Sequence, residues 1–445
     1  MQGFVDAGIL ASLFFVAASG YATTLYWDTN GSASGSGNAG GDWNTNAWWT
    51  TDSSGGTATG FYANLASATN DIYFSAGTDG TGTNTVTVTN VLAAYAVNKI
   101  AIEEGKVTLQ GSPNYRAITL TGAGEINVSS NASLSLSYVK IAGSAGLTKT
   151  GAGTLTKNAG TDTYTGTTRI KEGTFIDDNN AIPDTSAVVI DAGAVLSFNS
   201  GGGRGDTVGS IAGSGSVWIK TPSDSLGLAC GGDNSSTEFS GPMVAYTYRV
   251  GFFLKQGTGT LTLSSTNNTY TDKTLVSNGT LRVTGKHTGG GSYLVTSGAT
   301  LGGNGTISMD TNYVIRLIGS DAANRAKLVP GTTGAGGTLT VSNKLGGTNV
   351  VFDVYSELAV SLTGDTATKL ACGAMDLGGT NDFLTINVTG TRTRSRYVFA
   401  TYTGSLAGNI FDHVTVTGVS NSRIDYSTPG EIAVILTRGT LISIF

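Results

Sequence analysis

The sequence predicts an all-β protein folded as a right-handed parallel β-helix, and three observations lead to that fold. First, a strand-and-turn unit is repeated: the segment from Lys149 to Thr174 returns from Lys255 to Thr280, at an offset of 106 residues and without a gap. Second, 66 of 445 residues are glycine, while only 12% are charged. Third, short runs alternate between apolar and polar residues. Stacked repeats of this kind are typical of solenoids.

The composition excludes several other classes of protein. A hydrophobic fraction of 39% suffices for a core, and only 6 prolines argue against a proline-rich linker. The net charge is −5, and lysine and arginine are too scattered to form a nucleic-acid surface. Two cysteines in a chain of this length do not form a disulfide framework.

Residues 1–22 are predicted to be a signal peptide. Ile9 to Ala18 is an apolar run too short to span a bilayer, and Gly20-Tyr21-Ala22 provides small residues for cleavage after Ala22. The segment before the run lacks lysine and arginine and contains Asp6, which is atypical of such signals. The alternative is an apolar N-terminal strand. No later stretch is long and apolar enough for a membrane helix.

Residues 23–99 are predicted to form an aromatic-rich β cap, and residues 100–343 a β-helix with repeat copies at 146–219 and 252–309. Residues 344–445 are predicted to be further coils or a cap. Strands are expected at 85–89, 133–137, 338–341 and 414–417, where residues alternate at period two. Turns are expected at 122–124, 191–194 and 302–305. The length favours a solenoid over a single sandwich.

The interior is expected to be stacked from apolar side chains of successive coils, while threonine, serine and asparagine form outward ladders. Cys230 and Cys372 should be unpaired, because coils of roughly 20–25 residues, stacked about 4.8 Å apart, would separate them by several coils. The residues expected to point inward are Leu155, Phe175, Leu196, Leu261, Leu281 and Leu301.

The repeat resembles a known family. Lys-Thr-Gly-Ala-Gly-Thr-Leu-Thr from Lys149, then Tyr164-Thr165-Gly166 and Gly173-Thr174-Phe175, is similar to the autotransporter-associated β-strand repeat, also called the passenger-associated transport repeat. The second copy differs at Asp272-Lys273. The resemblance implies a secreted or cell-surface β-helical passenger of a Gram-negative-type bacterium and no specific catalytic residue. The motif positions are Lys149, Gly151, Gly153, Leu155, Tyr164, Gly173, Lys255, Gly257, Gly259, Leu261, Tyr270 and Gly279.

The flanks also resemble large secreted proteins that carry this repeat, through Trp27-Asp28 with Gly41-Asp42-Trp43-Asn44, and through 397–404 with 425–430. The chain departs from a complete autotransporter, because residues 344–445 do not contain the many strands of about ten residues that a membrane barrel needs. The terminal Phe445 is weak support for an outer-membrane strand. No sorting tail is recognised.

A search for catalytic patterns gives little. His287 and His413 are the only histidines, and neither has a partner at metal-ligand spacing, so both are expected at the surface. Gly35 to Gly40 has dinucleotide-fingerprint spacing, but it lies in a Gly/Ser loop before Trp43. No cofactor and no metal site are predicted. Glu103-Glu104 and Asp177-Asp178 are expected to be solvent-facing turn acids. Arg204-Gly205-Asp206 is expected to be a chance tripeptide.

Four of the five tryptophans lie close together near the N-terminus. They could plug the first coil of a solenoid, or they could present rings on which sugars stack. The plug is the favoured interpretation, and the alternative ligand platform comprises Trp27, Trp43, Trp48, Trp49 and Tyr62.

The predicted function is therefore a non-enzymatic structural or adhesive protein, outside the cell or on its surface. Its expected partners are surface glycans, extracellular matrix or like chains, and not nucleic acid. The alternative is a glycan-binding module or a carbohydrate-active β-helix similar to a polysaccharide lyase. For a lyase, Arg392, Arg394 and Arg396 form the only basic cluster, and it lies far along the sequence from the tryptophans.

Overall fold

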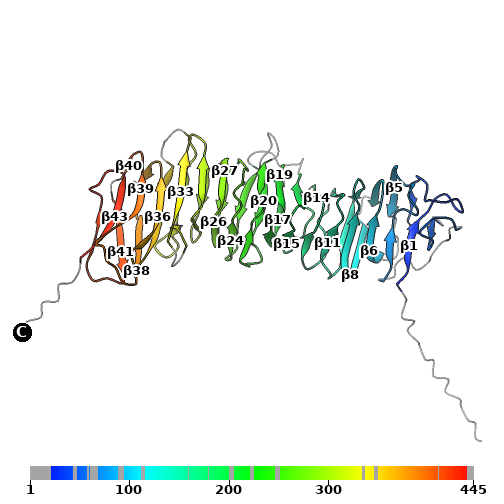
Figure 1. Cartoon of the computed structure of the whole chain (residues 1–445), viewed down its shortest axis with the longest axis horizontal. Coiled ribbons are helices and arrows are strands. Elements are labelled where there is room, and N and C mark those ends of the chain that lie inside the picture. Colours follow the sequence, from blue (N-terminus) through cyan, green and yellow to red (C-terminus); the bar gives the residue numbers. More distant parts are fainter. Residues whose placement is uncertain are drawn as a thin grey trace, which may run out of the picture.

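The computed structural model describes residues 22–43, 48–57, 60, 69–88, 95–111, 116–158, 160–178, 180–199, 205–220, 225–245, 251–332, 336–344, 349–408 and 410–437. Over these residues the chain is an elongated β-solenoid without a helix, which confirms the predicted all-β class (Figure 1). Strands of successive coils pair in parallel. Consequently none of the described segments is a helix that could cross a membrane.

The coils have three faces, named A, B and C. Face A contains β1(Thr24–Trp27), β4(Asp71–Tyr73), the second halves of β6(Tyr95–Ile102) and β8(Arg116–Val128), β11(Leu147–Thr150), β13(Thr168–Ile170), β15(Ala187–Ile190), β18(Ser210–Gly213), β21(Thr237–Phe239), β24(Thr260–Leu263), β26(Thr280–Val283), β29(Thr300–Gly303), β32(Ala326–Pro330), β35(Ser356–Thr363), β38(Phe383–Thr389) and β41(His413–Thr417).

Face B continues from one sheet into a second through backbone bonds at Asn268 and Thr269. It contains β2(Gly41–Asp42), β5(Thr83–Val88), β7(Lys106–Gly111), β9(Ser133–Ser137), β12(Thr154–Lys157), β14(Thr174–Asp177), β16(Val195–Phe198), β19(Ser216–Ile219), β22(Met243–Ala245), β27(Lys286–Gly290), β30(Thr306–Met309), β33(Gly337–Asn343), β36(Thr366–Cys372) and β39(Arg396–Tyr402).

Face C starts with the first halves of β6 and β8 and becomes regular after residue 205. It further contains β10(Val139–Ala142), β17(Asp206–Val208), β20(Leu226–Cys230), β23(Phe252–Lys255), β25(Thr274–Val276), β28(Tyr293–Val295), β31(Ile315–Leu317), β34(Val350–Phe352), β37(Met375–Asp376) and β40(Leu406–Ala407).

Alternation along each strand builds the core. In β12, Leu155 faces inward and is stacked between Leu134 and Phe175 of neighbouring coils, while Thr154 and Thr156 face outward. Such inward residues form one continuous apolar cluster that runs from Leu25 to Leu436. All six residues predicted to point inward are buried, at most 2% exposed, which confirms that assignment.

The predicted turn at 122–124 is instead a bend inside one strand. β8 runs through it from face C to face A, and both Gly122 and Gly124 have positive φ there, at 53° and 61°. Two glycines in the left-handed region let the backbone turn the corner between the two paired halves of the strand, 116–120 and 125–128. The alternating runs elsewhere lie in β5, β9, β33 and β41, as predicted.

Antiparallel strands occur at both ends of the rod. β3(Trp49–Thr50) pairs antiparallel with β1 at the N-terminal end. At the other end, β43(Glu431–Leu436) lies between β39 and β42(Ser422–Asp425) and is antiparallel to both. The parallel coils thus continue through β41, beyond which the described chain reverses (Figure 1).

Candidate functional site

The lysine of each repeat copy lies inside a corner of the solenoid. Lys149 Nζ donates hydrogen bonds to the carbonyl oxygens of Thr150, Gly151 and Glu172, at 2.9, 2.6 and 3.2 Å. Buried carbonyl groups need donors, so the ammonium group satisfies three backbone acceptors that the turn would otherwise leave unpaired.

The second copy repeats this arrangement. Lys255 Nζ donates to the carbonyl oxygens of Gln256, Gly257 and Asn278, at 2.7, 3.0 and 3.2 Å. These acceptors stand one, two and 23 residues after the lysine, as they do in the first copy. Burial lowers the pKa of Lys149 to about 8 and lowers the pKa of Lys255 as well. The motif lysine therefore has a structural task.

The motif glycines make the corner possible. Gly173 and Gly279 have φ values of 67° and 61°, in the left-handed region. A Cβ on either would lie 2.4 Å from a backbone oxygen of the coil before it, that of Gly153 or Gly257. Only glycine fits where two corners stack this closely.

A buried hydroxyl pair follows each lysine corner. Tyr164 Oη lies 2.5 Å from Thr168 Oγ1, and Tyr270 Oη lies 2.9 Å from Thr274 Oγ1. Burial raises the pKa of Tyr270 to about 12 and raises that of Tyr164. Both phenols therefore stay protonated, and each holds a hydrogen bond in the buried interior between a corner and the strand that follows it in the same coil.

The two copies build different corners of the rod. Lys149 is the second-last residue of β11 on face A, and the next strand, β12, lies on face B. Lys255 ends β23 on face C, and the next strand, β24, lies on face A. The repeat therefore specifies a corner and not a particular face.

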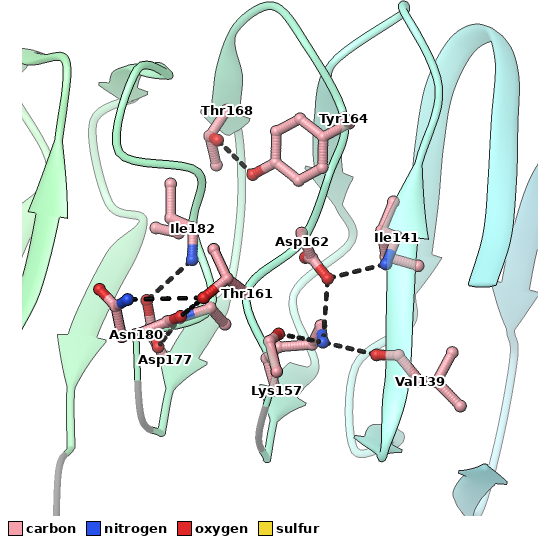
Figure 2. A network of polar contacts seen from close by, with 12 residues as sticks. Val139, Ile141, Lys157, Thr161, Asp162, Tyr164, Thr168, Asp177, Asn180 and Ile182 are labelled. Carbon is pink, nitrogen blue, oxygen red and sulfur yellow. Dashed lines mark hydrogen bonds and ion pairs between the residues drawn. The ribbon is translucent and has the colours of Figure 1, made fainter. Parts of the chain in front are cut away.

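Figure 2 shows a buried ion pair within the first copy. Lys157 Nζ lies 2.9 Å from Asp162 Oδ1, and both side chains are 1% exposed. Lys157 also donates to the carbonyls of Val139 and Gly160, and Asp162 Oδ1 accepts from Ile141 N at 2.7 Å. Burial raises the pKa of Asp162 to about 7, and Lys157 opposes that rise.

Two further acids meet on the next coils. Asp177 Oδ2 and Asp206 Oδ2 both accept from Ile182 N, at 3.3 and 3.2 Å, and their carboxyl groups hydrogen-bond each other. Burial, and then the charge of Asp177, raises the pKa of Asp206 well above its usual range. Asp206 therefore keeps its proton to a higher pH than an ordinary aspartate does, because a buried carboxylate beside another acid is disfavoured.

The burial of these acids corrects one prediction and agrees with another. Asp177 is not a solvent-facing turn acid, because it ends β14 with its side chain turned into the core, where it is 1% exposed. Asp206 is also 1% exposed, so it cannot present an Arg-Gly-Asp tripeptide to a receptor, and Arg204 lies outside the described residues. Glu103, by contrast, is exposed.

Stability is expected to depend on pH through Asp206. The pKa of Asp206 in the folded protein exceeds its unfolded value of about 3.8. The stability that this raised pKa contributes is therefore fully present below pH 4 and is lost as pH rises through the folded pKa. We expect Asp206→Asn to melt higher than wild type at pH 8, and this advantage to shrink toward pH 5. Each pKa unit is equivalent to about 1.4 kcal/mol.

The readout is the difference in melting temperature between variant and wild type across pH 5–8. His287, whose burial lowers its pKa to about 4, titrates in both proteins and cancels from that difference. Asp184→Asn at an exposed position is the matched control and should give no such trend. A pH-independent difference for Asp206→Asn would contradict the raised pKa of Asp206.

In the second copy of the repeat, an uncharged side chain takes the place of Asp162. Asn268 stands 106 residues after Asp162, and its Oδ1 accepts from Met243 N at 3.1 Å, as Asp162 does from Ile141 N. Leu263 replaces Lys157. An Asp or Asn two residues before each motif tyrosine is the sequence signal for this position, which is not among the predicted motif residues.

His287 is buried, contrary to the prediction of two surface histidines. Its Nε2 donates to the carbonyl of Tyr270 at 2.7 Å, which leaves Nδ1 to accept from Tyr293 Oη at 2.6 Å. The imidazole also stacks on the Tyr270 ring with centroids 4.1 Å apart. The His287 side chain thus fills the interior of the coil that follows the second repeat copy. His413 is exposed.

The N-terminal tryptophans pack against one another. Trp27, Trp43 and Trp49 are at most 2% exposed, and their rings also contact Phe74. Trp48 is half-buried, with its ring edge-on to Trp27. The three buried rings offer no face to a sugar, and Tyr62 lies outside the described residues.

The remaining candidates do not converge on one site. Arg396 binds Asp425 and Glu431, at 2.9 and 2.8 Å, and so ties β39 to the reversed strands. Arg392 and Arg394 line a surface cavity of about 480 Å³. These arginines lie at the opposite end of the rod from the tryptophans (Figure 1). Within the described ranges, no three His, Cys, Asp or Glu side chains are placed to bind a metal ion.

Comparison with protein families identifies the repeated segment. The model of the passenger-associated-transport-repeat matches the chain twice, at residues 147–176 and 253–283. Each match covers a lysine corner, its glycines and the tyrosine–threonine pair, which confirms the resemblance that the sequence indicated. No curated protein matches the chain.

Proposed function

We propose that this chain, a β-solenoid with two passenger-associated transport repeats, is an exported structural or adhesive protein of the passenger type. It acts at the cell surface or outside the cell. The observation that carries the proposal is that the repeat residues are used inside the molecule. Both lysines satisfy backbone carbonyls, and both tyrosines pair with buried threonines of the same coil.

The cysteines support the proposed location. Cys230 and Cys372 are free and buried, as predicted, and burial raises the pKa of each thiol to about 12. A buried thiol with a raised pKa reacts slowly, because the thiolate is the reactive form. The fold therefore tolerates an oxidising exterior without a disulfide.

The first test is export. The full chain and a variant lacking residues 1–22 are expressed in a Gram-negative host, and the cytoplasm, periplasm, outer membrane and medium are separated. We expect the full chain outside the cytoplasm and the shortened chain inside it. If both proteins have the same cytoplasmic distribution, the export part of the proposal is wrong.

The second test separates adhesion from catalysis. The purified protein is applied to a glycan array and to immobilised matrix proteins, and polysaccharides that it binds are assayed for cleavage. Binding without cleavage is the expected result. Cleavage of a bound polysaccharide would overturn the non-enzymatic assignment and favour the alternative of a carbohydrate-active β-helix.

A further inference from the structure

The two ends of the solenoid differ in how well they are closed. The buried tryptophans plug the N-terminal end. At the C-terminal end, Ile410 is 56% and Val414 is 46% exposed. Both line a groove of about 370 Å³, which we call the C-terminal groove. Its other lining residues are Phe411, Val416, Ser422, Arg423, Ile424 and Tyr426.

At the C-terminal groove, the stacked apolar side chains of face A in the described chain come to an end. A column of stacked inward residues follows face A through Leu281, Leu301, Leu328, Leu358 and Leu384, and every one of these leucines is completely buried. Val414 is the next member of that column, and Val416 follows Ile386 in the column beside it. Val414 is exposed because nothing in the described chain is stacked above it.

The strand that carries these valines has an unused edge. β41 pairs with β38 along one side, and no strand among the described residues pairs with its other side. A free edge with open apolar columns can accept one more strand, since its amide and carbonyl groups are a template for pairing.

We propose that the C-terminal groove is an interface with a second copy of this chain, formed by antiparallel pairing of the two β41 strands about a two-fold axis. A register centred on Thr415 places Val414 opposite Val416 of the other copy, so apolar residues meet on the inward face. The columns of inward side chains that contain Val414 and Val416 then continue from the core of one copy into the core of the other.

The strand is suited to pairing with itself. β41 contains no Asp, Glu, Lys or Arg, so the register brings no like charges opposite each other. A two-fold contact uses one patch on both chains and closes on itself, and it is the commonest form of self-association. The inference does not depend on the proposed function.

The first test is the molar mass of the full chain, measured by light scattering after size-exclusion chromatography at about 1 to about 100 µM, the range expected for a small interface. We expect the mass to rise from 45.2 kDa toward twice that value. Val414→Lys should abolish the rise. Val189→Lys, the same change on the outward side of β15, should not.

The second test is a cross-link at the two-fold axis. Directly opposite residues in antiparallel strands have Cα atoms about 4.5–5.5 Å apart, within disulfide range. Thr415→Cys should therefore form a disulfide-linked dimer on mild oxidation, whereas wild type should not, because its two thiols are buried.

Two results would overturn the proposal. The first is a single-chain mass at every concentration; if Val414→Lys then also lowers the melting temperature, a segment of the same chain covers the groove. The second is a dimer that survives Val414→Lys or resists the cross-link, because its interface would then lie elsewhere.

Discussion

Replacing Leu261 with aspartate is expected to unfold the middle of the rod. Leu261 is 2% exposed and is stacked directly on Leu281 in the face A column. The change removes a buried leucine side chain and places an unpaired carboxyl in the core, at a combined cost of about 5 kcal/mol or more. Circular dichroism and limited proteolysis would show the loss, with new cleavage in neighbouring coils.

The neighbouring residue provides the control. Thr262 faces outward between Glu238 and Arg282, so Thr262→Asp adds the same carboxyl where water solvates it. We expect a change within about 0.5 kcal/mol, as is usual for surface substitutions. If Leu261→Asp melts at the wild-type temperature, the assignment of the interior is wrong.

Replacing Lys157 with methionine is expected to cost about 3–5 kcal/mol, the usual penalty for removing one partner of a buried ion pair. Asp162 would remain buried without its counter-charge, and two carbonyl groups would lose their donor. The loss should be smaller at pH 5 than at pH 8, because Asp162 can then be protonated. Thermal melts at both pH values measure this difference.

The double variant Lys157→Met/Asp162→Asn separates charge from packing. It removes both charges but keeps an oxygen that accepts from Ile141 N. We expect it to recover most of the stability lost at pH 8 in the single variant. Equal losses in the single and double variants would show that the packing of Lys157 matters and the uncompensated charge does not.

The repeat and the alternation were enough to predict the fold. Leu155 and Leu261 stand at the same place in each copy, with polar neighbours on both sides, and this pattern predicts burial at both positions. The face on which each copy lies could not be predicted. Thr260 pairs with Thr280, 20 residues later, but Ala326 pairs with Ser356, 30 residues later. Because coil length varies beyond the expected 20–25 residues, a constant offset does not preserve the face.

The buried polar residues were mostly missed, and for a common reason. An isolated Lys, Asp or His in a polar segment is usually solvated. Lys149, Asp206 and His287 are buried because the stacking of coils brings a carbonyl, another acid or a tyrosine from a neighbouring coil into reach. Those partners are more than ten residues away, so local patterns do not reveal them.

In this protein the passenger-associated transport repeat builds a lysine-filled corner in a parallel solenoid. A crystal structure of the purified chain tests it most directly. We predict that Lys149 and Lys255 each bind three backbone carbonyls, at a corner between faces A and B and at one between faces C and A, with superposable backbones. A structure with either ammonium group in solvent, or with antiparallel sandwich pairing across residues 147–283, would contradict the claim.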